Sequence, residues 1–197
     1  MMMKRISALL VLMIFVASAS AQFKTNLSAD QWVDSVFKTL SKDDKIAQLF
    51  VVRTSAPPAA GSPIATFYDK EVEEAIRKYN IGALCLFQGG PQQHIQRINK
   101  FQQLSRVPLL VTIDGEWGLG MRMDSVKPLP RPMMLGAVQD ATIAYQYGKV
   151  IGEQCKRAGI QVNYGPVMDI NNNPDNPVIN DRSFGEDKYK VSAFGIQ

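Results

Sequence analysis

Short apolar segments alternate with amphipathic helical segments along this chain, and this alternation restricts the fold more than any other feature. The segments at 49–52, 83–87, 107–113 and 162–167 have the length and composition of buried strands. Between them, apolar residues recur at helical spacing. Because strands that alternate with helices form parallel sheets covered by helices, the sequence predicts an α/β fold.

Capping residues and apolar spacing predict where the helices begin, where they end and which faces they bury. The expected boundary residues are Ser28 with Gln31, Ser41 with Asp44, Asn80 with Gly82, Pro91, Asp140 and Gly159. The expected buried positions are Val72, Ile76 and Tyr79, then Ile95, Ile98, Phe101 and Leu104, then Ile143, Tyr147, Val150, Ile151 and Cys155. Gly148 and Gly152 are expected to let the last of these helices approach the sheet closely.

Two architectures fit this order, an open doubly wound sheet and a (β/α)₈ barrel. A dinucleotide-binding sheet needs a G-x-G-x-x-G turn after the first strand, and residues 53–61 contain none. A barrel needs about 250 residues, so four strands would be its first half. The chain ends inside the helix expected from Asp187. We therefore expect a truncated (β/α)₈ TIM barrel, with about four βα units present.

The N-terminus has the pattern of a secretory signal peptide. Lys4 and Arg5 precede an apolar run over 6–16, and small residues follow up to an A-x-A site ending at Ala21. We expect residues 1–21 to be removed and 22–197 to form one domain of an exported, periplasmic or extracellular protein. The apolar run is shorter than the ~20 residues of a membrane span, so no span is expected after cleavage. An uncleaved anchor is the alternative.

Charge and cysteine content argue against two classes of partner. Without residues 1–21 the net charge falls from +4 to about +2, and no basic stripe with interleaved aromatics supports nucleic-acid binding. Cys85 and Cys155 stand in apolar patterns, without a CxxC motif or a third ligand nearby. We expect buried free thiols and no metal or organic cofactor; a disulfide is the alternative in an exported protein.

Polar side chains gather where the expected strands end. The segment 161–187 passes from an apolar strand into a loop rich in Asn, Asp and Pro, which suits a ligand with many hydroxyls or, equally, an ordinary turn cluster. In parallel folds ligands bind beyond the carboxyl ends of strands. The polar residues there are Arg53, Gln88, Asp114, Glu116, Asp169, Asp181, Arg182, Glu186 and Asp187.

A suitably spaced carboxyl pair can hydrolyse a glycosidic bond, and position alone nominates Asp114 or Glu116 together with Asp169. The alternative for each carboxylate is to cap a helix or pair with an arginine. The single histidine, His94, falls in the first turn of a helix after Pro91 and is expected to face solvent, without a catalytic role.

Four segments resemble the N-terminal barrel domain of glycoside hydrolase family 3. They are KDDKIAQL at 42–49, IDGEWGLGMR at 113–122, YGPVMDIN at 164–171 and NPVINDRSFG at 176–185. The form of the last segment is similar to the bacterial β-N-acetylhexosaminidase branch. By this resemblance Asp114, Arg122 and Arg182 bind the sugar in the innermost subsite, which agrees with the hydrogen-bonding capacity of carboxylates and guanidinium groups.

The sequence also departs from the family pattern. Trp117 replaces a Gly and Leu119 an Arg, so Trp117 could offer a face for a sugar or pack beneath its loop. The resemblance places the nucleophilic Asp and the acid/base His beyond Gln197, so no catalytic residue is expected here. The expected whole protein is a retaining exo-β-N-acetylhexosaminidase, of which this chain binds the carbohydrate substrate but is itself inactive. A β-glucosidase or β-xylosidase of the same family, and a non-catalytic carbohydrate-binding module, are the alternatives.

Overall fold

The computed structural model describes residues 27–60, 62 and 64–197, so the expected signal peptide at 1–21 lies outside the described residues. The chain divides into two compact units, Met1–Leu40 and Ser41–Gln197. In the first unit, helix α2 (Ala29–Thr39) begins at the predicted capping box. The Gln31 N–H donates to Ser28 Oγ (3.3 Å) and the Ser28 N–H donates to Gln31 Oε1 (2.9 Å). No residue of this helix is buried.

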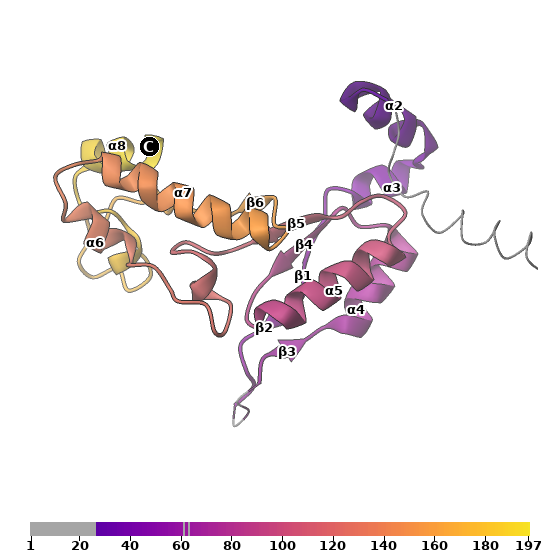
Figure 1. Ribbon diagram of the computed structural model, residues 1–197, viewed down its shortest axis with the longest axis horizontal. Coiled ribbons are helices and arrows are strands. Elements are labelled where there is room, and N and C mark those ends of the chain that lie inside the picture. The colour runs from indigo at the N-terminus through magenta and orange to yellow at the C-terminus, as the bar shows by residue number, and fades with distance from the viewer. Residues whose placement is uncertain (1–26, 61, 63) are drawn as a thin grey trace, which may run out of the picture. The chain divides into compact units, whose positions relative to one another are not determined.

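The second unit is built on a four-stranded sheet (Figure 1). Its strands, in spatial order, are β1 (Val51–Arg53), β4 (Ala83–Leu86), β5 (Leu110–Ile113) and β6 (Val162–Asn163), and each neighbouring pair is parallel. β1 and β6 are edges, each paired on one side only within the described chain. The sheet is therefore open, as in a partial barrel, and the predicted parallel α/β fold is confirmed.

Helices and one small hairpin connect these strands. The helices are α3 (Lys42–Ala47), α4 (Asp69–Glu74), the π-helical turn η1 (Ala75–Tyr79), α5 (Pro91–Leu104), α6 (Pro132–Gly136), α7 (Thr142–Arg157) and α8 (Lys188–Ile196), with 3₁₀ turns η2 (Leu119–Met121) and η3 (Asn180–Arg182). The antiparallel hairpin of β2 (Ser55–Ala56) and β3 (Thr66–Phe67) was not predicted, because its strands are only two residues long. Among the described residues, no helix is long and apolar enough to cross a membrane.

One face of the sheet carries most of the core. Leu84, Leu86, Val111 and Ile113 alternate along β4 and β5, so they point to the same side, and they pack against buried residues of the helices. Figure 1 shows α4 and α5 lying side by side on one side of the sheet. Since a doubly wound sheet needs helices on both faces, this arrangement favours the barrel interpretation.

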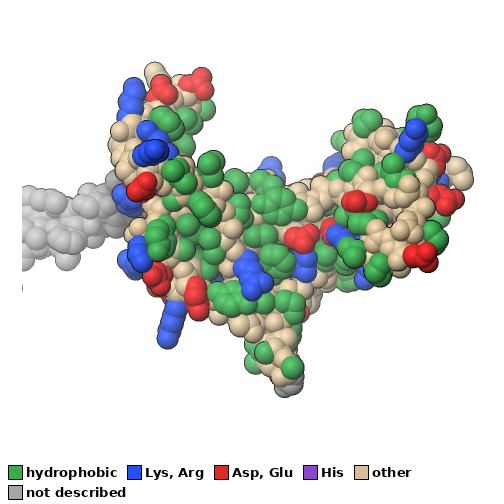
Figure 2. All heavy atoms as spheres, turned by 180° about the vertical axis from the view of Figure 1, so that it is seen from behind, with side chains coloured by type: hydrophobic (Ala, Val, Ile, Leu, Met, Phe, Trp, Pro, Cys, Tyr) green, Lys and Arg blue, Asp and Glu red, His purple; other side chains and the backbone are tan. Residues whose placement is uncertain are grey.

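The opposite face of the sheet exposes apolar side chains. Val51 on β1 is 46% exposed and Leu110 on β5 is 44% exposed. Figure 2, seen from behind, shows hydrophobic side chains gathered across the middle of the molecule. Such a face is typical of the interior side of a barrel, where side chains of other strands fill the space in the closed fold.

Several boundary predictions are confirmed because they depend on local interactions. Helix α5 begins at Pro91, as predicted. Asp140 was expected to cap α7, but the N-cap position is Ala141; Asp140 lies one residue earlier, and its Oδ1 accepts from the Thr142 N–H (2.9 Å). Asn80 ends η1 in the left-handed conformation (φ 58°), which Asn tolerates better than most residues. Cys85 and Cys155 are buried and free, as predicted.

Several predictions about buried faces are wrong. Tyr79, Ile143 and Val150 were expected to be buried but are 53%, 42% and 42% exposed. His94, expected in solvent, is only 1% exposed, whereas Ile95, expected in the core, is 45% exposed. The buried face of α5 includes position 94 and not position 95. Position 94 is four residues before Ile98 and seven before Phe101, so it lies on the same side of the helix as these buried residues. Phe67 packs against the His94 ring with centroids 5.9 Å apart.

The expected role of Gly148 and Gly152 is also wrong. A Cβ atom at either position would meet no atom within 4 Å, so neither glycine provides close approach to the sheet. Ile151 and Cys155, on the same stripe of α7, make that contact through their side chains. The two glycines line a cavity of about 500 Å³ beside Glu116 and Phe194.

Candidate functional site

The loop after β5 carries two carboxylates on either side of a glycine. Strand β5 ends at Ile113 and is followed directly by Asp114, Gly115 and Glu116. The Asp114 side chain is 30% exposed and that of Glu116 is 3% exposed. We call these residues, together with Arg122, Asn163 and Arg182, the strand-end cluster. It lies at the carboxyl end of the parallel sheet, where this class of fold places its ligands.

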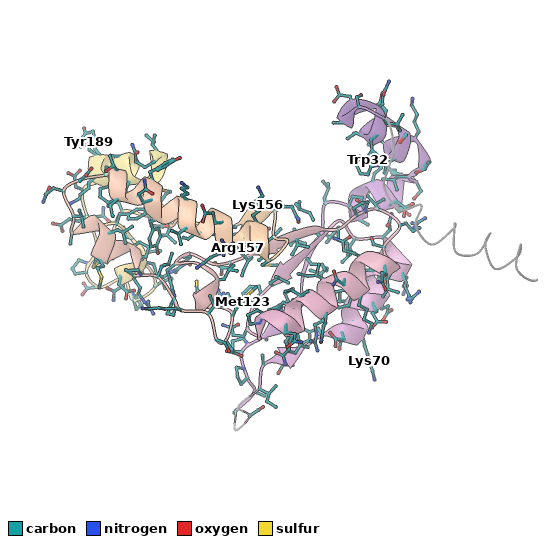
Figure 3. All side chains as sticks on the ribbon, in the orientation of Figure 1. Trp32, Lys70, Met123, Lys156, Arg157 and Tyr189 are labelled. Carbon is teal, nitrogen blue, oxygen red and sulfur yellow. The ribbon has the colours of Figure 1, made fainter. Side chains whose placement is uncertain are left out.

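Arg122 is held by Asp114. Its Nε donates to the Asp114 backbone oxygen (2.7 Å) and its Nη2 to Asp114 Oδ2 (2.5 Å). The guanidinium carbon lies 4.7 Å from the centre of the Phe87 ring, which follows β4. The loop folds back at η2, and the Gly89 N–H donates to the Arg122 backbone oxygen (3.2 Å). The ends of β4 and β5 are thereby connected, with Met123 in the same loop (Figure 3).

Arg182 is held by Glu116. Nε donates to Oε2 (2.9 Å) and Nη2 to Oε1 (2.6 Å), while Nη1 donates to the Val178 backbone oxygen (3.1 Å). The hydrogen bonds to Glu116 raise the pKa of the Arg182 guanidinium, and the charges of Glu116, Asp114 and Asp169 act in the same direction. Glu116 thus binds Arg182 directly, while Asp114 and Asp169 act on it through their charges.

A phenol borders the buried carboxylate. Tyr147 on α7 donates its hydroxyl to the Pro130 backbone oxygen (2.7 Å). Burial raises the pKa of the Tyr147 phenol, and the charge of Glu116 raises it further. A neutral phenol donating to a backbone carbonyl keeps a second negative charge away from Glu116.

Asn163, the last residue of β6, joins that strand to the loop after β5. Its Oδ1 accepts from the Gly115 N–H (2.9 Å), and its Nδ2 donates to the Gly115 carbonyl oxygen (3.1 Å). Asn163 was not among the predicted site residues. The available signal was an Asn inside an otherwise apolar strand, where this residue type is unfavourable without a specific partner.

A third arginine–carboxylate pair lies at the edge of the site. Arg131 stacks on the Trp117 ring, 4.4 Å from its centre, and its Nη1 lies 2.9 Å from Asp181 Oδ1. Trp117 is thus half-buried beneath a guanidinium, which favours packing within the loop over an open sugar platform. Because Asp181 and Arg182 are adjacent in η3, this pair and the Arg182–Glu116 pair both connect the loop after β5 to η3.

The remaining predicted residues do not join the strand-end cluster by any direct bond in the described structure. Arg53 is exposed and donates to the Tyr68 hydroxyl (3.1 Å). Asp169 is exposed, and its charge acts on Arg182. Asp187 caps α8, with Oδ1 accepting from the Tyr189 N–H (2.8 Å). Among residues 27–60, 62 and 64–197, no three His, Cys, Asp or Glu side chains are grouped so as to hold a metal ion.

The cluster offers acceptors and donors suited to a neutral polyhydroxy ligand. Within the described part of the chain, Asp114 Oδ1 has no hydrogen-bond partner, and this side chain is partly open to solvent. Each guanidinium has more N–H groups than its carboxylate partner uses. The carboxylate that faces Arg182 is buried, so the open acceptor is Asp114.

The open parallel sheet, with helices on one face and polar side chains at its carboxyl end, defines a protein of the (β/α)₈-barrel class. Residues 41–197 match the family model described as the glycosyl hydrolase family 3 N-terminal domain. The chain belongs to this family, which confirms the resemblance found in the sequence.

Known relatives agree with this assignment. The chain is 34% identical over 139 residues to β-hexosaminidase A of Pseudoalteromonas piscicida, covering 64% of this chain and 23% of the relative. A solved family 3 β-N-acetylglucosaminidase from Paenibacillus sp. str. FPU-7 superposes with a TM-score of 0.65 at 33% identity, over 79% of this chain and 30% of that one. The β-glucoside phosphorylase BglX has a TM-score of 0.70 at 25% identity, over 87% and 30%. This chain thus spans less than a third of the length of these relatives.

Proposed function

We propose that the protein hydrolyses β-glycosidic bonds and removes terminal N-acetylglucosamine residues as a retaining exo-glycosidase. The observation that carries this proposal is the pair of carboxylate–arginine units on either side of Gly115, at the carboxyl end of β5. Family membership and the similarity to proteins named β-hexosaminidase and β-N-acetylglucosaminidase support it.

In this proposal Asp114, Arg122 and Arg182 bind the sugar and do not react with it. The free oxygen of Asp114 accepts hydroxyl hydrogen bonds, and the unused N–H groups of the two guanidinium groups donate to ring substituents. Retaining hydrolysis also needs a nucleophilic carboxylate and an acid/base group. We place both outside residues 1–197, so this chain alone supplies binding without turnover.

Turnover of chromogenic glycosides tests the proposal. Protein expressed from the complete reading frame is expected to release p-nitrophenol from the β-N-acetylglucosaminide faster than from the β-glucoside or β-xyloside. Residues 22–197 alone are expected to release none. Absence of turnover by the longer protein, or turnover by residues 22–197, would contradict the assignment of roles.

A β-glucoside substrate is the second candidate, because the similar BglX is named a β-glucoside phosphorylase. The same panel, run with and without inorganic phosphate, separates the possibilities. A preference for the glucoside indicates a changed sugar specificity, and dependence on phosphate indicates phosphorolysis. Binding of N-acetylglucosamine without turnover by the protein from the complete reading frame would support a non-catalytic carbohydrate-binding module.

We also propose that the protein is exported after cleavage behind Ala21, because 1–21 has the charge, apolar and small-residue regions of a signal peptide. The mature protein is expected to begin at Gln22. N-terminal sequencing of protein recovered from the cell envelope or medium tests this, and a protein that retains Met1 in the cytoplasm would contradict it.

A further inference from the structure

The glycine between the two carboxylates of the strand-end cluster has both its backbone N–H and its carbonyl bound by one side chain. Asn163 accepts from the Gly115 N–H (2.9 Å) and donates to the Gly115 carbonyl (3.1 Å). An amide side chain has one group of each kind on a single plane, so it can bind both groups of one residue. Asn163 therefore restrains the backbone at Gly115 as a strand partner would.

Gly115 links the two carboxylate residues that hold Arg122 and Arg182. Asp114, on one side, holds Arg122, and Glu116, on the other, holds Arg182. A rotation of the Gly115 backbone would move the two carboxylates relative to each other. A Cβ atom at this position would lie 3.3 Å from Asn163 Oδ1 and 3.3 Å from the Gly118 oxygen, so Gly115 is closely packed on this side.

The backbone alone does not provide this restraint. The ladder between β5 and β6 registers Ile113 opposite Asn163, and its last hydrogen bond runs from the Tyr164 N–H to the Ile113 oxygen (2.8 Å). Beyond it, β6 continues without strand structure into Gly165 and Pro166. The Asn163 side chain therefore extends the hydrogen bonding between β5 and β6 beyond the end of β5, to Gly115 in the strand-end cluster.

We propose that Asn163 is a positioning residue, which sets the relative placement of Asp114 and Glu116, and through them of Arg122 and Arg182, for sugar binding. This inference rests on the proposed function of the same site. Asn163 acts through Gly115 and is not proposed to touch the substrate.

Gln161, directly before the start of β6, provides a matched control. Its Oε1 accepts from the Val111 N–H (2.8 Å) and its Nε2 donates to the Gly159 oxygen (2.9 Å). It thus makes the same kind of amide-to-backbone bonds, one of them to β5, from the position directly before β6, whereas Asn163 is the last residue of β6. Loss of these bonds weakens the β5–β6 connection without altering Gly115.

The experiment compares Asn163→Leu, Asn163→Asp and Gln161→Leu in protein from the complete reading frame. Leu preserves most of the volume and removes both hydrogen bonds, and Asp retains the acceptor but not the donor. Since small displacements of binding groups can cost about 100-fold in rate, we expect Asn163→Leu to lower kcat/KM by roughly 10- to 100-fold and Asn163→Asp by less. Gln161→Leu is expected to lower Tm comparably but to leave kcat/KM within about threefold.

A second measurement is independent of turnover. In a crystal structure of Asn163→Leu, we expect at least one of the two contacts, Arg122 to Asp114 or Arg182 to Glu116, to be displaced. If the unaltered protein hydrolyses no glycoside, the proposed function fails and this structure alone decides the inference. Equal kcat/KM losses in Asn163→Leu and Gln161→Leu, or unmoved arginine pairs in Asn163→Leu, would overturn it.

Discussion

Glu116 and Arg182, 66 positions apart in the chain, form a bidentate ion pair, with Nε–Oε2 at 2.9 Å and Nη2–Oε1 at 2.6 Å. Glu116 is 3% exposed and Arg182 31%. A buried carboxylate of this kind is stable only while its partner is present. The pair therefore couples the folding of the 180–182 turn to the end of β5.

Removal of Arg182 is expected to destabilise the protein more than removal of an exposed arginine. Arg182→Ala leaves Glu116 buried without its partner, so we expect a loss of about 3 kcal/mol in the free energy of unfolding. Arg131→Ala removes an exposed pair with Asp181 and should cost under about 1 kcal/mol from the charges. Urea unfolding of both variants measures the two losses of unfolding free energy. Losses of equal size would show that the burial of Glu116 does not increase the cost of removing its partner.

Asp114 is expected to contribute to binding of the sugar. Hydrogen bonds to a charged group contribute about 1.5–3 kcal/mol, so Asp114→Ala should lower kcat/KM by roughly 10- to 150-fold in protein from the complete reading frame. Asp175→Ala, an exposed carboxylate in the polar segment, is the control and should have little effect. Kinetics with the N-acetylglucosaminide measure both, and unchanged kcat/KM in Asp114→Ala would exclude it from the site.

Gly136 is expected to be intolerant of any side chain. A Cβ atom there would lie 1.7 Å from the Phe184 backbone oxygen, in the loop that follows Arg182. Because backbone must move to relieve this overlap, Gly136→Ala should be strongly destabilising. Gly148→Ala meets no atom within 4 Å and should stabilise α7 by up to about 1 kcal/mol. Thermal unfolding distinguishes them, and a higher Tm for Gly136→Ala would contradict this packing.

His94 is expected to make stability depend on pH. Burial lowers the pKa of this imidazole, Arg97 lowers it further, and the nearby Phe87 backbone and the charge of Asp124 oppose the shift. The folded state therefore takes up a proton less readily than the unfolded state. Stability should be full above the unfolded pKa of about 6.5 and should fall as pH decreases from there to the folded pKa.

Because His94 is the only histidine of the chain, substitution isolates this effect. Urea unfolding between pH 7.5 and pH 5 should show a smaller pH dependence in His94→Leu than in the unaltered protein. Carboxylates titrate mainly below this range. The same slope in both proteins would show that His94 is not the group responsible.

The sequence was most informative where structure depends on neighbouring residues. The capping box at Ser28, the helix start at Pro91 and the helix end at Asn80 all involve groups within a few positions of one another. Periodicity also predicted the parallel order of the sheet. It failed for His94 and Ile95, because adjacent positions on a helix differ by only 100° and the packed face is chosen by the sheet.

The sequence by itself determined the alternation of strands and helices, the family and the residues at the strand ends, because these follow from local patterns and motifs. Only the tertiary structure decided that Glu116 binds Arg182, that Asp114 Oδ1 remains available as an acceptor, and that Asn163 hydrogen-bonds to Gly115. The last pair is 48 positions apart in the chain. The register of the parallel strands decides which distant side chains come within hydrogen-bond distance. Local sequence patterns do not predict that register.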